Sequence, residues 1–153
     1  MLRSILNWLL AALKKPTPTP VPPQPVPTPP SGNFIADLLK LHNDHRQSIG
    51  LSPLVLNNTL NQAAQNHSVW MNANNNLSHD ENGVDPGARL TKLGYRWNTY
   101  GENIAMGYAT PSAVFAGWLS SSGHRRNIEN PSFVEVGFGL SGTYWTTDFG
   151  RRI

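Results

Sequence analysis

The sequence contains no cysteine, so it can form neither a disulfide framework nor a thiolate metal site. A fold built from these 153 residues must be stabilised by packing, for which five tryptophans provide large apolar side chains. The apolar run near the N-terminus is far shorter than the ~20 residues that a membrane-spanning helix needs. His-Glu-x-x-His, Gly-x-Ser-x-Gly, phosphate-loop and dinucleotide-binding motifs are absent as well. No familiar catalytic motif therefore assigns an activity.

Over most of the chain, neither basic nor acidic residues are in excess. The formal net charge of +3 comes from Arg3, Lys14 and Lys15, and residues 34–153 contain nine Lys and Arg against nine Asp and Glu. A nucleic-acid-binding domain would carry an excess of basic residues on its folded part. We therefore expect no nucleic-acid partner.

Composition divides the chain into three parts. Residues 1–15 are apolar with basic residues at both ends, residues 16–32 are rich in proline, and residues 33–153 have the mixed composition of a globular domain. Nine of the 13 prolines lie in the middle segment, which favours an extended polyproline II spacer of roughly 45 Å. The pattern predicts one domain held at a distance from the N-terminal segment.

The first 15 residues fit two interpretations. Arg3 followed by the apolar run to Leu13 is typical of a secretory signal, although Lys14 closes the run and no small-residue cleavage site is evident. On a helix the same residues form one polar and one apolar face, as in an anchor that associates with a membrane interface. Both interpretations predict a protein that is secreted and extracellular, or tethered to a membrane surface.

Residues 33–153 contain both helical and strand patterns. Helices are predicted over 34–49, 58–74, 86–93 and 111–121. Strands are predicted over 99–107, 134–140 and 143–149. We expect a hairpin at Ser141-Gly142 and a turn at Gly123. The residues expected in the core are Trp118, Trp145 and Phe149. Helices at the front and paired strands at the back predict an α+β fold in layers.

The polar residues that stand out lie in three short segments. These segments are Ser78-His79-Asp80, Gly101-Glu102-Asn103 and Gly123-His124-Arg125-Arg126-Asn127. Their spacing matches no helical metal motif, so the pattern alone leaves their distances from one another open. His42, His45 and His67 lie on the apolar sides of their predicted helices, and we expect them to be packing residues, with His67 hydrogen-bonded in the core.

The order of the motifs resembles the CAP family, also called SCP-like, which includes cysteine-rich secretory proteins, antigen 5 and plant pathogenesis-related proteins. The resemblance covers about residues 34–150. The motifs that carry it are His42-Asn43 with Arg46, Leu51-x-Pro53-Leu54, Ala63-Ala64, His79, Gly101-Glu102-Asn103-Ile104-Ala105, Trp118-x-x-Ser121-x-Gly123-His124-Arg125-x-Asn127-Ile128, Glu135-Val136-Gly137-Phe138-Gly139 and Asp148-Phe149-Gly150. The short loops and absent cysteines resemble the bacterial or phage-borne branch. The resemblance implies a three-layer α-β-α sandwich with a central antiparallel sheet.

The family's groove commonly holds two histidines and two acidic residues. By motif position, His79, His124 and Glu102 match three of these, whereas Ser121 occupies the position of the second acid. The resemblance implies that His79 and His124 bind Zn²⁺ or another divalent cation. The residues expected around them are Glu102, Ser121, Asn103 and Arg125. With one carboxylate missing, binding should be weak unless Glu102 joins directly or orients a histidine.

Three functions are compatible with these features. The first is an extracytoplasmic binding module whose ligand is a lipid, a cell-envelope component or another protein. The second is a metal-assisted, peptidase-like hydrolase in which Glu102 acts as general base toward a zinc-bound water. The third is a structural role in which the groove is vestigial. A catalytic zinc usually has three protein ligands, and Ser121 leaves the sequence short of that number, which favours the binding module over an enzyme.

Overall fold

The structure, a computed structural model, describes residues 33–153. The predicted signal or membrane anchor (residues 1–15) and proline-rich spacer (residues 16–32) lie outside the described residues. Within residues 33–153, no helix is both long enough and apolar enough to cross a membrane.

The described residues form five helices and four strands. The helices are α2 (Phe34–Ser48), α3 (Asn58–Asn74), α4 (Pro86–Lys92), α5 (Pro111–Ser120) and α6 (Ser122–Ile128). The strands are β1 (Val55–Leu56), β2 (Trp97–Met106), β3 (Glu135–Ser141) and β4 (Tyr144–Arg152). The predicted elements are confirmed with small shifts at their ends, and β1 is an addition.

One local prediction is wrong, because Gly123 lies inside α6 instead of in a turn. The backbone of Ser121 is extended, and its carbonyl accepts the first hydrogen bond of the new helix from the N–H of Arg125 at 2.8 Å. Glycine lowers helix stability by only about 1 kcal/mol relative to alanine. Tertiary contacts of α6 with β2, described below, outweigh that preference.

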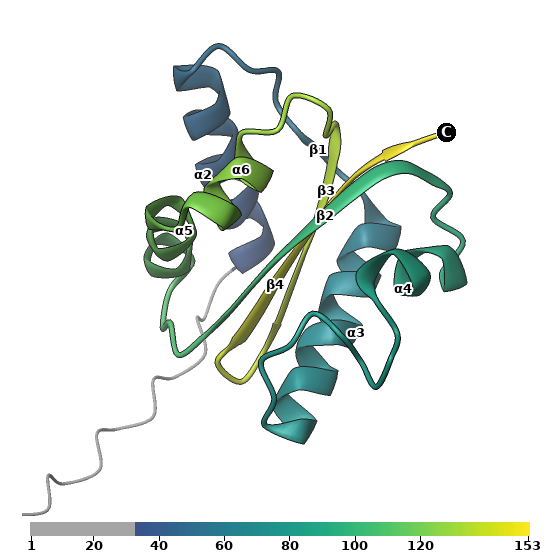
Figure 1. Ribbon diagram of the computed structural model, residues 1–153. Helices are drawn as coiled ribbons and strands as arrows, with labels where there is room; N and C mark the ends of the chain where they lie inside the picture. Colours follow the sequence, from purple (N-terminus) through teal and green to yellow (C-terminus); the bar gives the residue numbers. More distant parts are fainter. Residues whose placement is uncertain (1–32) are drawn as a thin grey trace, which may run out of the picture.

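The helices cover both faces of the sheet, as Figure 1 shows. On one side lie α2, α5 and α6, and on the other lie α3 and α4. The strand order is β1-β3-β4-β2, with β3, β4 and β2 antiparallel and the two-residue β1 parallel to β3. The α+β class and the three-layer α-β-α sandwich are thus confirmed, and the antiparallel sheet gains one short parallel pair.

The larger part of the core lies between the sheet and the layer of α2, α5 and α6. The residues predicted for the core, Trp118, Trp145 and Phe149, are at most 1% exposed and belong to it. A smaller cluster beneath α3 and α4 contains Leu60, Ala63, Leu90 and Tyr95. The sheet is therefore buried on both faces, which leaves its outer strands as places where a groove can open.

Side chains of α3 close the edge of β3 beyond the short strand β1. Asn61 accepts a hydrogen bond from the backbone N–H of Phe138 at 2.8 Å. Gln65 accepts from the N–H of Leu140 at 3.1 Å and donates to its carbonyl at 2.9 Å. Because an open strand edge invites pairing with other chains, these two amides replace a missing strand and fix α3 against β3.

The β3–β4 hairpin is confirmed, with its turn one residue later than predicted. Ser141 pairs with Tyr144, so the two turn residues are Gly142 and Thr143. Gly142 has φ +59°, and a glycine with positive φ at the first position is what a type II′ hairpin turn requires.

His42 is a fully buried histidine of α2, as expected of a packing residue. Its ring centroid lies 4.8 Å from that of Phe115 and 5.1 Å from that of Phe138. Its Nδ1 lies 2.7 Å from the Leu38 carbonyl and therefore donates to it. Burial lowers the pKa of His42 from 6.5 to about 4, so the folded protein keeps this ring neutral at physiological pH.

We expect His42 to make the protein sensitive to mild acid. In the unfolded chain its pKa is the ordinary 6.5, so unfolding takes up a proton as the pH falls from 6.5 toward about 4. Over that window the free energy of unfolding should drop by roughly 3 kcal/mol from this group alone. The variant His42→Gln keeps a donor for Leu38 and should show a flatter decline in urea unfolding between pH 7 and pH 4. Parallel declines in the two proteins would contradict this assignment.

Candidate functional site

The site is built on β2, which is an outer strand of the sheet. Successive side chains of a strand point to opposite faces, so Glu102 faces the α3–α4 layer and Asn103 faces the layer of α6. The loop of residues 75–85 brings His79 to Glu102, and α6 brings His124 to Asn103. His79 therefore approaches β2 from the side of α3 and α4, and His124 from the side of α6.

Glu102 is the buried centre of the site, with a side chain only 2% exposed. Its Oε1 lies 2.7 Å from Nδ1 of His79, and its Oε2 accepts from Nη2 of Arg89 at 2.5 Å. Burial by itself raises the pKa of Glu102, but the hydrogen bond from His79 and the positive charges of His67 and Arg89 outweigh it and lower the pKa. Glu102 is therefore an anion, and both of its oxygens have a partner.

The contact with Glu102 fixes which nitrogen of the His79 ring carries the hydrogen. An ionised carboxylate can only accept hydrogen bonds, so Nδ1 of His79 must carry the hydrogen. In the neutral ring Nε2 then has a free electron pair. Because the His79 side chain is 51% exposed, this nitrogen is accessible from outside. Glu102 thus holds His79 in the form that a metal ion or a proton donor can bind.

Two asparagines tie α6, and with it His124, to the central strand. Asn103 donates to the carbonyl of His124 at 3.0 Å, and Asn127 donates to the carbonyl of Glu102 at 3.1 Å and to Oδ1 of Asn103 at 2.8 Å. Burial and the nearby charge of His79 lower the pKa of the His124 ring. Both imidazoles are thus attached to the same strand, His79 through Glu102 and His124 through the contacts of Asn103 and Asn127.

Two further residues, Arg89 and His67, contact Glu102, and sequence reasoning did not place them in the site. Arg89 of α4 also donates to the carbonyls of His79 at 2.7 Å and Val84 at 3.2 Å, which holds the loop. His67 is fully buried, and its Nδ1 lies 2.6 Å from Glu81, which confirms it as a hydrogen-bonded core histidine. Its Nε2 is 3.7 Å from Oε1 of Glu102. In the sequence, the only feature that could have drawn attention to Arg89 was its charge next to the apolar Leu90 in a short predicted helix.

The two remaining predicted residues belong to the α6 segment, with Ser121 just before the helix and Arg125 in its middle. Ser121 occupies the N-cap position, and its side chain makes no capping hydrogen bond. The Arg125 side chain is exposed, and no hydrogen bond or ion pair involves it within residues 33–153. Their contribution to the groove stays a prediction.

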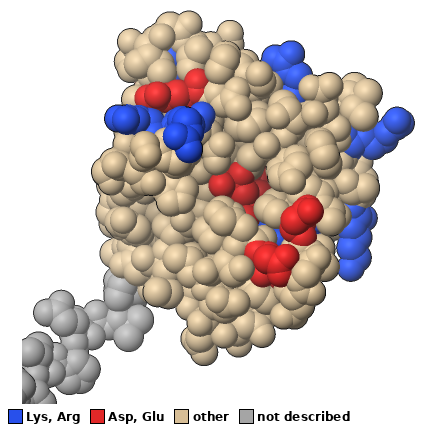
Figure 2. Space-filling model, viewed as in Figure 1, with Lys and Arg blue, Asp and Glu red and all other residues tan. Residues whose placement is uncertain are grey.

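Charge is unevenly distributed around the site. Figure 2, viewed as Figure 1, shows acidic side chains near the middle of this face and basic side chains mostly toward its margins.

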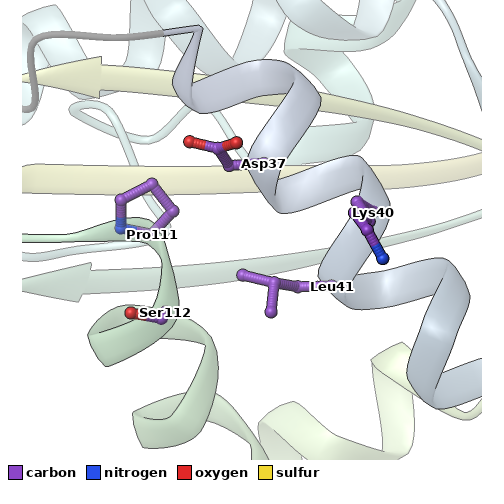
Figure 3. Close-up of a pocket in the computed structure, with 5 residues that line it drawn as sticks. All are labelled: Asp37, Lys40, Leu41, Pro111 and Ser112. Atoms are coloured by element: carbon purple, nitrogen blue, oxygen red, sulfur yellow. The ribbon is translucent and has the colours of Figure 1, made fainter.

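A separate hollow of about 260 Å³ lies between α2 and α5. Its lining residues, which Figure 3 shows, are Asp37, Lys40, Leu41, Pro111 and Ser112. Only Leu41 and Pro111 among these are apolar, so the hollow has a mixed lining.

The comparison with family models decides the family to which this fold belongs. Residues 39–149 match the model of the cysteine-rich secretory protein family, CAP. This chain belongs to the CAP family. It does so without any cysteine, so the CAP fold here depends on packing and hydrogen bonds alone.

Two curated relatives of this CAP domain come from Bacillus subtilis. The uncharacterised protein YkwD is 38% identical over 115 residues, which are 73% of this chain and 45% of YkwD. The uncharacterised membrane protein YlbC is 33% identical over 116 residues, which are 75% of this chain and 34% of YlbC. The chain therefore spans less than half the length of either relative.

Solved structures show the same CAP fold. An extracellular protein of Bacillus anthracis with an SCP domain has a TM-score of 0.76 at 32% identity, over 78% of this chain and 40% of that one. An outer surface protein of Borrelia burgdorferi has a TM-score of 0.74 at 23% identity, over 77% of this chain and 92% of that one. At that identity the Borrelia protein supports the fold alone.

The donor atoms around Glu102 offer a cation at most two histidine ligands. Within the described part of the chain, no three His, Asp or Glu side chains form a group that could hold a metal ion. The available ligand atoms are the imidazole nitrogens of His79 and His124, because Glu102 is already bonded to His79 and Arg89. A ligating histidine whose second nitrogen donates to a carboxylate is the usual arrangement at metal centres, and His79 fits it. Water would have to complete the coordination.

Proposed function

We propose that this CAP domain is an extracytoplasmic binding module whose groove takes a divalent cation, such as Zn²⁺, through His79 and His124. The observation that carries the proposal is the 2.7 Å contact between Nδ1 of His79 and Oε1 of Glu102. It leaves Nε2 of His79 to face outward as a ligand. The lowered pKa of His124 favours the neutral ring, which is the form that binds metal.

The same geometry favours binding over hydrolysis. A general base must have an oxygen free to take a proton from water and a pKa near the working pH. Both oxygens of Glu102 are engaged, and its pKa is lowered. Glu102 therefore suits an orienting role, in which it holds His79 and balances Arg89.

Two relatives support an extracytoplasmic location for the module. The Bacillus anthracis protein is extracellular, and YlbC is a membrane protein. By analogy, residues 1–15 would export the chain or tether it to a membrane, and its further ligand would be a lipid or a cell-envelope component.

The experiment that tests the groove is a calorimetric titration of Zn²⁺ into the full chain, prepared without an affinity tag. We expect binding in the unmodified protein and none in the double variant His79→Ala/His124→Ala. The variant Glu102→Gln should bind roughly 10–100-fold more weakly, because it loses the group that orients His79. The matched control is His45→Ala, since His45 lies on α2 and bonds Glu129 at 2.9 Å. Equal heats in the double variant and the unmodified protein, or no heat in either, would refute the proposal.

A further inference from the structure

Asp148 carries a second buried carboxyl group beside Glu102. The two residues lie opposite each other in the antiparallel register of β2 and β4. Residues directly opposite in such a pair point to the same face of the sheet, so both side chains enter the α3–α4 layer. Asp148 is only 2% exposed, and its Oδ1 has no hydrogen-bond partner.

The proximity of these two buried carboxyl groups calls for a proton on one of them. Directly opposite residues of an antiparallel pair have Cβ atoms about 4.5–5.5 Å apart, so Asp148 and Glu102 are close neighbours on one face of the sheet. Two ionised carboxylates have no hydrogen to share and repel each other strongly in a buried site. One of the two groups must therefore be a neutral carboxylic acid.

The partners of each group indicate which one holds the proton. Glu102 accepts from Arg89 at 2.5 Å and bonds His79 at 2.7 Å, and both contacts stabilise its negative charge. Within residues 33–153, by contrast, Asp148 forms no ion pair and leaves one oxygen unpartnered. The cations of the cluster thus act on Glu102, and the proton belongs on Asp148.

We propose that Asp148 is a neutral carboxylic acid at physiological pH, that it donates a hydrogen bond to Glu102, and that it is thereby a positioning residue for His79. The first two statements concern the protein without any ligand. The third rests on the proposed function, because only a groove that binds a cation needs His79 in a fixed orientation.

The surroundings of Asp148 agree with this assignment. The charged and titratable groups around the pair are His67 from α3, His79 and Glu81 from the loop, and Arg89 from α4. Burial and the negative charge of Glu102 raise the pKa of Asp148 well above its ordinary 3.8, and Arg89 counteracts this only in part. A neutral Asp148 leaves one negative charge on Glu102 for the Arg89 guanidinium to balance.

Infrared spectroscopy of the full chain in D₂O tests the proton directly. At pH 7 the unmodified protein should show the carbonyl stretch of a protonated carboxylic acid, and Asp148→Asn should lose it. The matched control is Asp44→Asn, because Asp44 is exposed and pairs with Lys40 on the surface of α2. A spectrum without this band, or a band that survives Asp148→Asn, would overturn the assignment.

The affinity for Zn²⁺ tests the positioning role separately. In Asp148→Asn the amide can still donate to Glu102, so the affinity should stay within about threefold of the unmodified protein. Asp148→Ala removes the donor and should weaken binding roughly tenfold or more. Circular dichroism shows whether each variant folds. If Asp148→Ala folds, an unchanged affinity for Zn²⁺ refutes the positioning role. If Asp148→Ala does not fold, the role is refuted by a loss of more than threefold in the affinity of Asp148→Asn.

The two proposals can also fail separately. A protein that shows the infrared band but binds no Zn²⁺ would refute the proposed function and leave the proton assignment standing.

Discussion

Replacing Gly139 with alanine should lower the free energy of unfolding by about 3 kcal/mol or more, because β3 and α3 touch backbone to backbone at this point. A Cβ atom on Gly139 would lie 2.2 Å from the carbonyl carbon and oxygen of Ala64 and 2.4 Å from the nitrogen of Gln65. Backbone atoms in the middle of a helix cannot rotate away as a side chain can. The whole of α3 would have to move, which would break the hydrogen bonds between Gln65 and Leu140.

Urea unfolding, followed by tryptophan fluorescence on the full chain, measures this effect. The matched control is Gly123→Ala, also a glycine-to-alanine change without positive φ. At Gly123 the nearest atom to the new Cβ is Nη2 of Arg126 at 4.0 Å, and the helical position favours alanine. The control should be neutral or slightly stabilising. If Gly139→Ala were as stable as this control, the close approach of α3 and β3 would be wrong.

Replacing Arg46 with methionine should lower the free energy of unfolding by about 3 kcal/mol or more, because it leaves several buried carbonyl groups without donors. Arg46 is 1% exposed. Its guanidinium donates to the carbonyls of Ser52 and Ile128 at 2.8 Å, Asn130 at 2.9 Å and Phe133 at 3.3 Å. It therefore connects α2 to the segment that runs from the end of α6 to β3.

The control for this variant is Arg125→Met, which removes an exposed guanidinium. Its stability should stay within about 0.5 kcal/mol of the unmodified protein. Chemical unfolding of both variants under the same conditions gives the difference. A small effect of Arg46→Met would mean that water replaces the lost donors.

A Zn²⁺ titration of Arg125→Met would also show whether Arg125 contributes to the groove, as its motif position predicts.

The family motif around Arg46 is therefore structural in this protein. Asn43, three residues earlier, pairs with both backbone groups of Leu54, at 2.7 Å and 3.0 Å. His42 packs among aromatic rings of the core. The motif residues hold α2 to the rest of the fold, and the candidate site lies elsewhere on the chain.

Local pattern was enough to predict most of the secondary structure. Helix starts were recognisable because their caps are local, as where Thr110 accepts from the N–H of Ala113 just before Pro111. Apolar spacing indicated the buried faces for the same reason. The α6 helix was missed because its stability comes from asparagine contacts with a strand some 20 residues earlier in the sequence.

The candidate site divides in the same way. Motif order alone pointed to His79, Glu102 and His124, because these residues stand in recognisable segments of the sequence. Nothing local connects Glu102 with Arg89, His67 or Asp148. These residues come from four different elements, and only the folding of two helices over the outer strand brings them together.

The sequence by itself determined the α+β class and most of the helices and strands, since each depends on spacing along the chain. Its resemblance to the CAP family singled out three candidate site residues. Only the tertiary structure decided the burial, hydrogen bonding and charge of those residues. It buried Glu102, gave it Arg89 as a counter-ion and placed Asp148 opposite it in the sheet. The reason is physical, because charge, tautomer and proton position depend on distance and burial in space, and these arise only when the layers pack.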